Sequence, residues 1–192
     1  MTKRDTDRDT NGNSEQAGAE TPAVFDAAAV RRQYHEFPPV YDQNSRILIL
    51  GSFPSVKSRA QAFYYGHPQN RFWKVLAAVA GEQISDDTEA RRRFLLRRGI
   101  ALWDVLESCE IHGSSDASIR AAEPVEIERI TGACSIERIC VNGSTAKKYY
   151  DRYLRRRTGR EAVLLPSTSP ANAAWSLARL TEAWRAALGD CI

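Results

Sequence analysis

Short apolar runs alternate along this chain with segments in which apolar residues recur every three or four positions. The run 47–50 consists of Ile, Leu, Ile and Leu, and Gly51 and Pro54 end it, which is typical of a strand buried on both faces. Strands of this kind are typical of parallel sheets that are covered by helices. Similar runs predict three more strands, at 100–105, 138–142 and 161–165.

Helical patterns separate these strands. In the segment 71–80 the apolar residues fall on one helix face, and Gly81 ends the segment. Other helices are expected at 27–37, at 86–98 after a cap by Asp86 or Asp87, at 126–131, at 145–157 after a cap by Ser144, and around 175–188. The segment 108–120 is predicted to be a polar loop. Because strands and helices alternate, we expect an α/β fold, a three-layer α/β/α sandwich with a central four-stranded parallel sheet.

Charge is distributed unevenly along the 192 residues. The segment 1–22 is polar and nearly free of large apolar residues, which predicts a disordered tail before a single domain at 23–192. The first twenty residues carry three basic and five acidic side chains, so the +3 net charge leaves about +5 on the remainder. A mildly basic domain suits a partner that carries phosphate.

Several classes of protein are disfavoured by the sequence. No apolar run approaches the roughly 20 residues of a membrane helix, and the N-terminus lacks the apolar core of a secretory signal. The four cysteines form no C-x-x-C pair, so neither a metal site nor an iron–sulfur cluster is expected. We therefore expect a cytoplasmic protein, monomeric and free of cofactors, metals and membrane contacts.

Aromatic, amide and hydroxyl side chains collect in the loops that follow the strands. The first such loop contains Tyr65, His67 and Asn70, the second begins at Asp104, and the last spans 167–172. Ligands of parallel sheets bind beyond the carboxyl ends of the strands. Aromatic faces and hydrogen-bonding edges suit a flat, neutral heterocycle.

Each of these residues also has a purely structural interpretation. Asn70 could cap the helix that follows it, as Asn often does. Asp104 could cap an element or pair with an arginine, and His67 could only fix a turn before Pro68. The basic residues in 147–157 are best interpreted as a solvated helix face.

Four motifs resemble those of the uracil-DNA glycosylase superfamily, and within it the hypoxanthine-DNA (deoxyinosine) glycosylase branch. They are GSFPS at 51–55, FYYGHPQNRFW at 63–73, GIALWDVLESCE at 99–110 and LPSTSPANA at 165–173. They occur in the family's order, and the resemblance extends over about 45–188. It implies the fold expected above and a base-excising site in the strand-end loops.

The resemblance also implies roles for individual residues. Asn70 matches the asparagine linked to catalysis in the hypoxanthine branch, and Tyr65 matches an aromatic residue that stacks on the extruded base. Phe53 stands where many relatives place an Asp or Asn that orients water, and Ser167 stands where relatives place a catalytic His or Asn. Base-binding residues implied in this way are Gly51, Ser52, Phe53, Pro54, Tyr65, His67 and Asp104.

Contacts with the DNA backbone are implied mainly for the last loop. Ala171 takes the place of the Leu with which relatives fill the gap left by the base. The residues expected to contact DNA are Ser55, Ser58, Ser169, Pro170, Ala171 and Asn172.

The function implied is hydrolysis of the N-glycosidic bond of a deaminated base that is flipped out of DNA, with hypoxanthine first and uracil second. No lyase step is expected, because Lys57 and Lys74 are the lysines that lie beside these motifs, and neither is placed in the pocket. Two alternatives remain open, a DNA-binding module of the same fold with weak or no catalysis, and a hydrolase of free nucleosides.

Overall fold

Four parallel strands form the central sheet of the computed structural model, which describes residues 31–188 and 192. The strand order is β3-β2-β6-β7. Their bounds are β2 (Ile47–Gly51), β3 (Ile100–Asp104), β6 (Arg138–Asn142) and β7 (Val163–Leu165). Every residue of β2 and β3 is buried, as their continuous apolar runs predict. The predicted four-stranded parallel sheet is confirmed.

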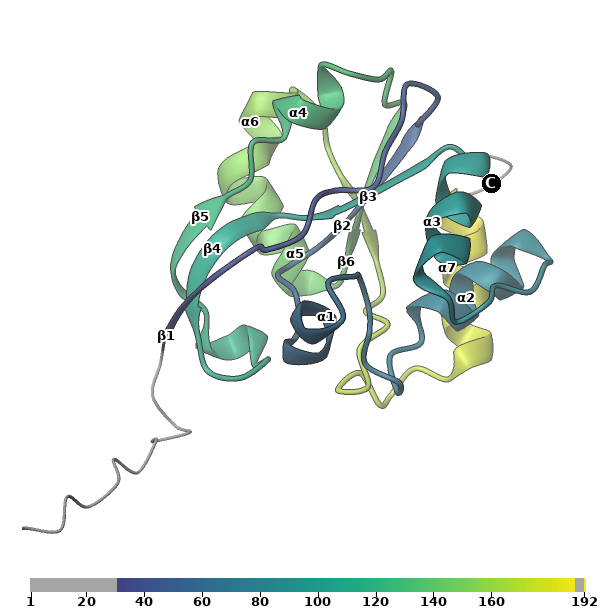
Figure 1. Cartoon of the computed structure of the whole chain (residues 1–192), viewed down its shortest axis with the longest axis horizontal. Coiled ribbons are helices and arrows are strands. Elements are labelled where there is room, and N and C mark those ends of the chain that lie inside the picture. The colour runs from purple at the N-terminus through teal and green to yellow at the C-terminus, as the bar shows by residue number, and fades with distance from the viewer. Residues whose placement is uncertain (1–30, 189–191) are drawn as a thin grey trace, which may run out of the picture.

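Helices cover both faces of this sheet (Figure 1). On one side lie α2 (Phe72–Ala80), α3 (Thr88–Arg97) and α7 (Leu177–Leu188). On the other side lie α4 (Glu128–Thr131) and a continuous helical segment made of α5 (Ser144–Tyr149), the π-helical η2 (Tyr150–Leu154) and α6 (Arg155–Thr158). A short helix, α1 (Val56–Ala60), lies in the loop after β2. The three-layer arrangement is therefore confirmed.

A second sheet was not predicted. It is antiparallel, in the order β1-β4-β5, and comprises β1 (Arg31–Tyr34), β4 (Leu106–Ile111) and β5 (Arg120–Pro124). The predicted helix 27–37 is wrong where the structure describes it, because 31–34 pairs with β4; the segments 1–22 and 27–30 lie outside the described residues.

The predicted polar loop 108–120 is also wrong, because both of its ends belong to strands of this sheet. It begins as β4, whose polar Ser108 is buried together with Cys109 and Ile111. Only the tip, with a 3-10 turn η1 (Asp116–Ser118), remains irregular before β5 begins. The Ser108 hydroxyl donates to Glu123 of β5 over 2.7 Å, so its burial carries a hydrogen bond.

Helix ends follow the predicted signals in two of three cases. Asp87 caps α3 by accepting from the Ala90 N–H, and Gly81 ends α2 with a left-handed φ of 69°. Ser144 is not the cap of α5, because that helix begins at Ser144 and its cap is Gly143. A side chain at Gly143 would meet the Ser167 Cβ at 3.0 Å, and its φ of 97° also favours glycine.

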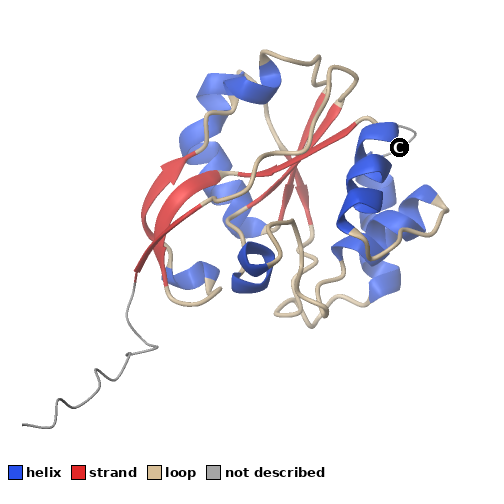
Figure 2. Cartoon of the chain, viewed as in Figure 1, coloured by secondary structure: helices blue, strands red, loops and turns tan. Residues whose placement is uncertain are grey.

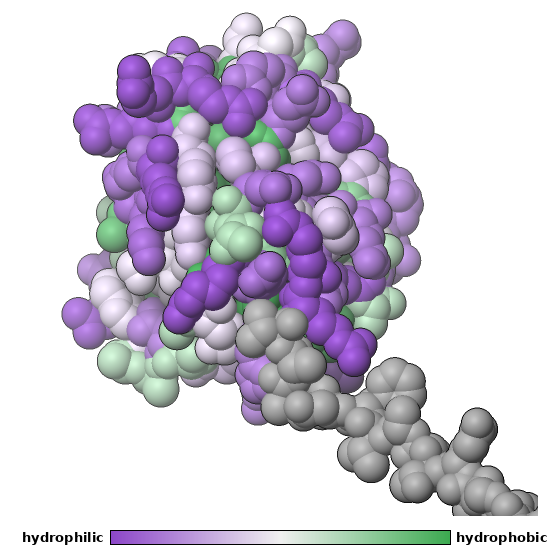
Figure 3. All heavy atoms as spheres, turned by 90° about the vertical axis from the view of Figure 1, so that its left-hand side faces the viewer, coloured by the Kyte–Doolittle hydropathy of each residue, from purple (hydrophilic) through white to green (hydrophobic). Residues whose placement is uncertain are grey.

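The surface beside the antiparallel sheet is mostly hydrophilic, and its apolar patches are small and separate (Figure 3). Within 31–188, no helix is long and apolar enough to cross a membrane. The same part of the chain contains no cluster of three or more His, Cys, Asp or Glu side chains that could hold a metal ion.

Candidate active site

The loops that follow the parallel strands meet at one end of the molecule, the lower end in Figure 2. The loop after β2 and the loop after β7 lie side by side there, since the Arg71 N–H donates to the Thr168 carbonyl over 3.1 Å. Gly51 and Asp104 are paired in register at the ends of β2 and β3. The structure therefore brings together the three loops in which the sequence placed candidate chemistry.

Gly51 leaves room for two side chains at this end of the sheet. A Cβ at this position would lie 2.1 Å from Oδ1 of Asp104 and 3.1 Å from the hydroxyl of Tyr65. A Cβ at 2.1 Å would force the Asp104 carboxylate to move, so glycine is favoured here for a steric reason and not for its φ. The Asp104 carboxylate and the Tyr65 hydroxyl therefore converge on one point.

Asp104 is held by a residue that the sequence did not single out. Nε2 of His35 lies 3.0 Å from Oδ2 of Asp104, and the two side chains are 1% and 6% exposed. The His35 ring packs among Phe37, Tyr64 and Trp103, with centroid distances of 4.6, 5.8 and 6.5 Å. The partner considered for Asp104 was an arginine, and the structure gives it a histidine from the segment after β1.

Tyr65 lies with one ring face against Phe72, at 3.8 Å between centroids and 15° between planes. Its φ of 52° is unusual for a bulky residue and costs on the order of 1 kcal/mol. Its hydroxyl is buried, faces Asn142, and makes no hydrogen bond within the described part of the chain. Burial, and then the nearby Asp104 carboxylate, raise the pKa of Tyr65 far above its ordinary value, so the phenol stays protonated.

The N-cap of α2 is Arg71 and not Asn70, so the N-cap interpretation is wrong in its position, but the Asn70 side chain still caps the first N–H of the helix from one residue earlier. Its Oδ1 accepts the Phe72 N–H over 3.0 Å, while its own N–H donates to the His67 carbonyl over 2.9 Å. The side chain is half-buried, and its amide nitrogen makes no hydrogen bond to the described residues. A capping role and a role toward a substrate are compatible here.

Arg71 fastens the last loop to the start of α2, a role that was not predicted from the sequence. Its guanidinium donates to the carbonyls of Thr168 (3.4 Å), Ser169 (2.7 Å), Asn172 (3.0 Å) and Trp175. These carbonyls span eight residues of a segment without regular structure. Because the guanidinium donates all of these hydrogen bonds to the loop, Arg71 fixes the shape of the loop.

Further hydrogen bonds fix the same loop from within. Asn142, at the end of β6, donates to the Thr168 hydroxyl over 2.9 Å and accepts the Thr168 N–H over 3.1 Å. The Ser167 hydroxyl accepts the Ser169 N–H over 3.2 Å, and Asn172 donates to the Ser167 carbonyl over 2.9 Å. Pro170 and Ala171 are exposed at the tip.

The loop after β2 is also tightly organised. Phe53 and Pro54 are buried, and the Arg59 guanidinium lies over the Phe53 ring at 5.7 Å. Ser55 caps α1 through the Ser58 N–H, and the buried Ser58 hydroxyl accepts the Gly66 N–H.

His67 takes the turn-fixing role that was its structural interpretation. Its Nδ1 accepts the Gln69 N–H over 3.2 Å, and its side chain is half-buried. No contact in the described residues carries it toward Asp104 or Tyr65.

Asp116 brings a second carboxylate to the site from the tip between β4 and β5. It accepts from the Ser52 hydroxyl over 3.0 Å, and the hydroxyl of Ser114 from the same tip accepts the Val56 N–H over 2.9 Å. Desolvation raises the pKa of Asp116, and so does the Asp104 carboxylate, against the hydrogen bond from Ser52. The sequence predicted a polar loop at this tip and indicated no role for Asp116.

Comparison with known proteins supports one family. Residues 38–188 match the family model described as Uracil DNA glycosylase superfamily. The chain is 38% identical over 152 residues to the Hypoxanthine DNA glycosylase of Methanosarcina acetivorans, covering 78% of this chain and 94% of the relative. It is 36% identical over 138 residues to the Hypoxanthine DNA glycosylase of Methanosarcina barkeri, covering 71% and 86%.

A solved structure agrees with this match. It is a solution NMR structure of a Methanosarcina acetivorans protein that carries a uracil DNA glycosylase name, with a TM-score of 0.67 and 36% identity. The similarity covers 81% of this chain and 96% of that one. The matched region includes Gly51, Tyr65, Asn70, Asp104 and the loop 167–172. This chain belongs to the uracil DNA glycosylase superfamily.

Proposed function

We propose that this protein is a DNA repair glycosylase that removes hypoxanthine from DNA, with uracil as the second substrate. Relatives named Hypoxanthine DNA glycosylase, more than a third identical over most of the chain, support the substrate. The observation that carries the proposal is the meeting of Asp104 and Tyr65 over the bare Cα of Gly51. This arrangement offers an aromatic platform and a hydrogen-bond acceptor at the carboxyl ends of the strands.

Base recognition follows from the two side chains. The flipped base stacks on the Tyr65 face that Phe72 does not cover. Asp104 accepts the ring N–H of the base, which hypoxanthine carries at N1 and adenine lacks. Ser52 and the buried Phe53 and Pro54 form the wall beside the base in this proposal. They shape the site and make no hydrogen bond to the base.

The bond to be broken joins the base to deoxyribose. Its cleavage passes through an oxocarbenium-like sugar while negative charge develops on the departing base. In our proposal the Asn70 amide orients the attacking water, and the Ser167 hydroxyl lies beside the leaving base. An amide cannot ionise, so it activates water less than a carboxylate does. Hypoxanthine suits such a site because protonation of its ring nitrogens eases its departure.

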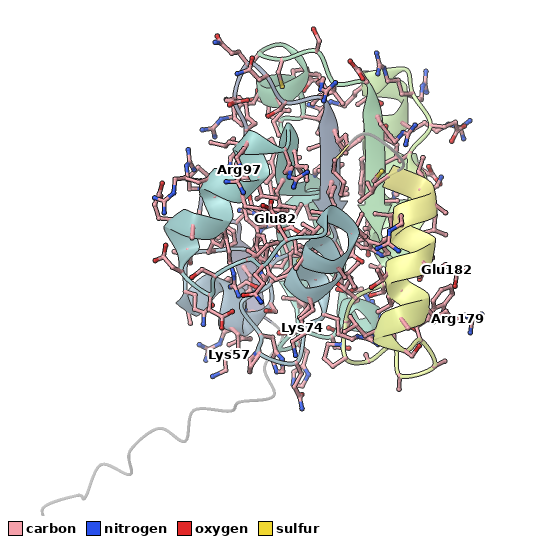
Figure 4. All side chains as sticks on the ribbon, turned by 90° about the vertical axis from the view of Figure 1, so that its right-hand side faces the viewer. Lys57, Lys74, Glu82, Arg97, Arg179 and Glu182 are labelled. Carbon is pink, nitrogen blue, oxygen red and sulfur yellow. The ribbon has the colours of Figure 1, made fainter. Side chains whose placement is uncertain are left out.

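The DNA strand is proposed to lie across the loop end of the molecule. In this proposal the exposed Pro170 and Ala171 and the half-buried Ser55, Ser169 and Asn172 face the backbone, while Ser58 is buried and supports the loop. Figure 4 shows Lys57, Lys74 and Arg179 toward this same end. All three side chains are exposed, and none forms an ion pair within the described residues, so they are available to phosphates. We propose that the enzyme acts as a monomer and as a hydrolase without metal, cofactor or lyase step.

One oligonucleotide panel tests this function. Duplex and single-stranded DNA carrying hypoxanthine, uracil or xanthine is incubated with the enzyme, along with free deoxyinosine. We expect release of hypoxanthine from DNA, and loss of more than about 100-fold in rate for Asn70→Ala. Tight binding of abasic DNA without cleavage of any substrate would instead indicate the binding module, and cleavage of free deoxyinosine alone the nucleoside hydrolase.

A further inference from the structure

The His35–Asp104 pair joins two segments that are 69 residues apart in sequence. A carboxylate accepts hydrogen bonds, so Nε2 of His35 is the donor to Oδ2 of Asp104 at 3.0 Å. Oδ1 of Asp104, in contrast, makes no hydrogen bond within the described part of the chain and lies over Gly51. One carboxylate oxygen is therefore engaged and the other is left as an acceptor.

The polar group next to that free oxygen is also unsatisfied. The Tyr65 hydroxyl is buried, makes no hydrogen bond within the described residues, and faces the same point over Gly51. Buried polar groups without partners are rare and costly in folded proteins, and a catalytic role is one of the reasons for which they are kept. The buried, unpartnered Tyr65 hydroxyl and the free Oδ1 of Asp104 converge on one glycine, which makes this place the candidate site for a polar ligand edge.

His35 itself has little freedom to move. Its side chain is 1% exposed, and three aromatic rings surround it, those of Phe37, Tyr64 and Trp103. The backbone N–H of His35 also donates to the Glu107 carbonyl over 2.8 Å, which ties it to β4. A donor fixed in this way holds the Asp104 carboxylate in one orientation.

We propose that His35 is the positioning residue for base recognition: it fixes Asp104 so that Oδ1 accepts the ring N–H of the flipped base. This inference rests on the proposed glycosylase function. The ligand class is a base with a ring N–H next to a carbonyl, which includes hypoxanthine and uracil and excludes adenine. His35 does not touch the base and acts through Asp104.

A double-mutant cycle separates positioning from packing. His35→Phe keeps an aromatic ring in the cluster and removes the donor, while His35→Gln keeps an N–H donor of similar reach. We expect kcat/KM on hypoxanthine DNA to fall by about 10- to 100-fold in His35→Phe and to recover to within about fivefold of wild type in His35→Gln.

In the Asp104→Ala background nothing is left to position. The additional change His35→Phe is then expected to alter kcat/KM by less than about threefold, because the two residues act as one unit. An equal loss in both backgrounds, or no loss in the wild-type background, would overturn the inference. His35→Phe alone could fail to fold, because the buried Asp104 carboxylate loses its partner. The double variant lacks that carboxylate, so its kcat/KM is then compared with that of Asp104→Ala. A lower kcat/KM in the double variant would also overturn the inference.

The proposed function and this inference fail in different ways. A wild-type enzyme inactive on every oligonucleotide contradicts the glycosylase function. An active wild type whose His35 variants keep full activity leaves that function intact and contradicts only the role of His35.

Discussion

Oδ1 of Asp104 lies 2.1 Å from the position that a Cβ of Gly51 would occupy. The two residues are register partners at the ends of β2 and β3, and the carboxylate of one occupies the space that a side chain on the other would need. This arrangement joins the fold to the proposed chemistry.

Replacing Gly51 with alanine should displace Asp104. A contact of 2.1 Å cannot be absorbed without movement, and the carboxylate is held on its other side by His35. We expect kcat/KM on hypoxanthine DNA to fall by at least about 100-fold, with a stability loss of about 1–3 kcal/mol from overpacking. Gly81→Ala is the control, because Gly81 lies at the other end of α2. It forces a side chain to a φ of 69° and should cost about 1 kcal/mol of stability while activity is retained. Equal activity losses in the two variants would contradict the steric argument.

Replacing Arg71 with lysine should loosen the loop 167–175. Lysine keeps the charge, but its single ammonium cannot reach the four carbonyls that the planar guanidinium bridges. We expect about a tenfold or greater loss of activity and a stability loss of about 1–3 kcal/mol, measured by glycosylase assay and urea unfolding. Arg185→Lys, which loses one bond to the Ala78 carbonyl, is the matched control and should change little. An Arg71→Lys enzyme as active as wild type would show that the loop holds its shape by other bonds.

Removing the cations at the loop end should reduce the salt dependence of DNA binding. Each phosphate contact contributes about 0.9 to the slope of log K against log salt. The triple variant Lys57→Ala, Lys74→Ala and Arg179→Ala should lower that slope by about 2–3, measured by fluorescence anisotropy with an oligonucleotide duplex. Arg97→Ala removes a charge that pairs with Glu82 above this end in Figure 4, and should leave the slope unchanged. A lower slope in the Arg97 variant alone would place the DNA on another surface.

Alkaline pH should destabilise the protein through its buried thiols and phenols. Burial raises the pKa of Cys109 from 9.0 to about 11, and burial also raises the pKa of Tyr150. A folded-state pKa above the unfolded value gives stability that is present below pH 9 and is lost as pH rises toward 11. The urea midpoint should therefore fall between pH 8.5 and 10.5, and Cys109→Ala should reduce that fall. Cys109 should also resist a thiol reagent at pH 8 until the protein is unfolded; rapid native labelling there would argue against its burial.

The parallel sheet could be predicted because its evidence is local. β2 and β3 are short apolar runs that end in Gly or a polar residue. The apolar face of α2 can be recognised within its nine residues. The motifs around Gly51, Tyr65 and Ser167 lie at the end of β2 and in the loops after β2 and β7, so their meeting at one edge could be expected from topology.

The antiparallel sheet could not be found in the same way. β1 is the polar segment RRQY, partly exposed, and its pairing partner β4 lies more than seventy residues away. An edge strand of this kind carries no apolar alternation, and the only evidence for it is the pairing itself. His35 depends on that strand for its place, so its partnership with Asp104 was missed along with β1.

Three successive residues at the start of α2 carry three separate tasks. Asn70 presents its amide, Arg71 fastens the opposite loop, and Phe72 backs the Tyr65 ring. Because all three lie at the N-terminal end of α2, any tilt or slide of this helix changes water placement, loop shape and platform angle together. Substitutions in the contact between α2 and α7, which does not touch the base, should therefore change turnover and affinity together. A change in only one of the three tasks would require substitutions outside the N-terminal end of α2.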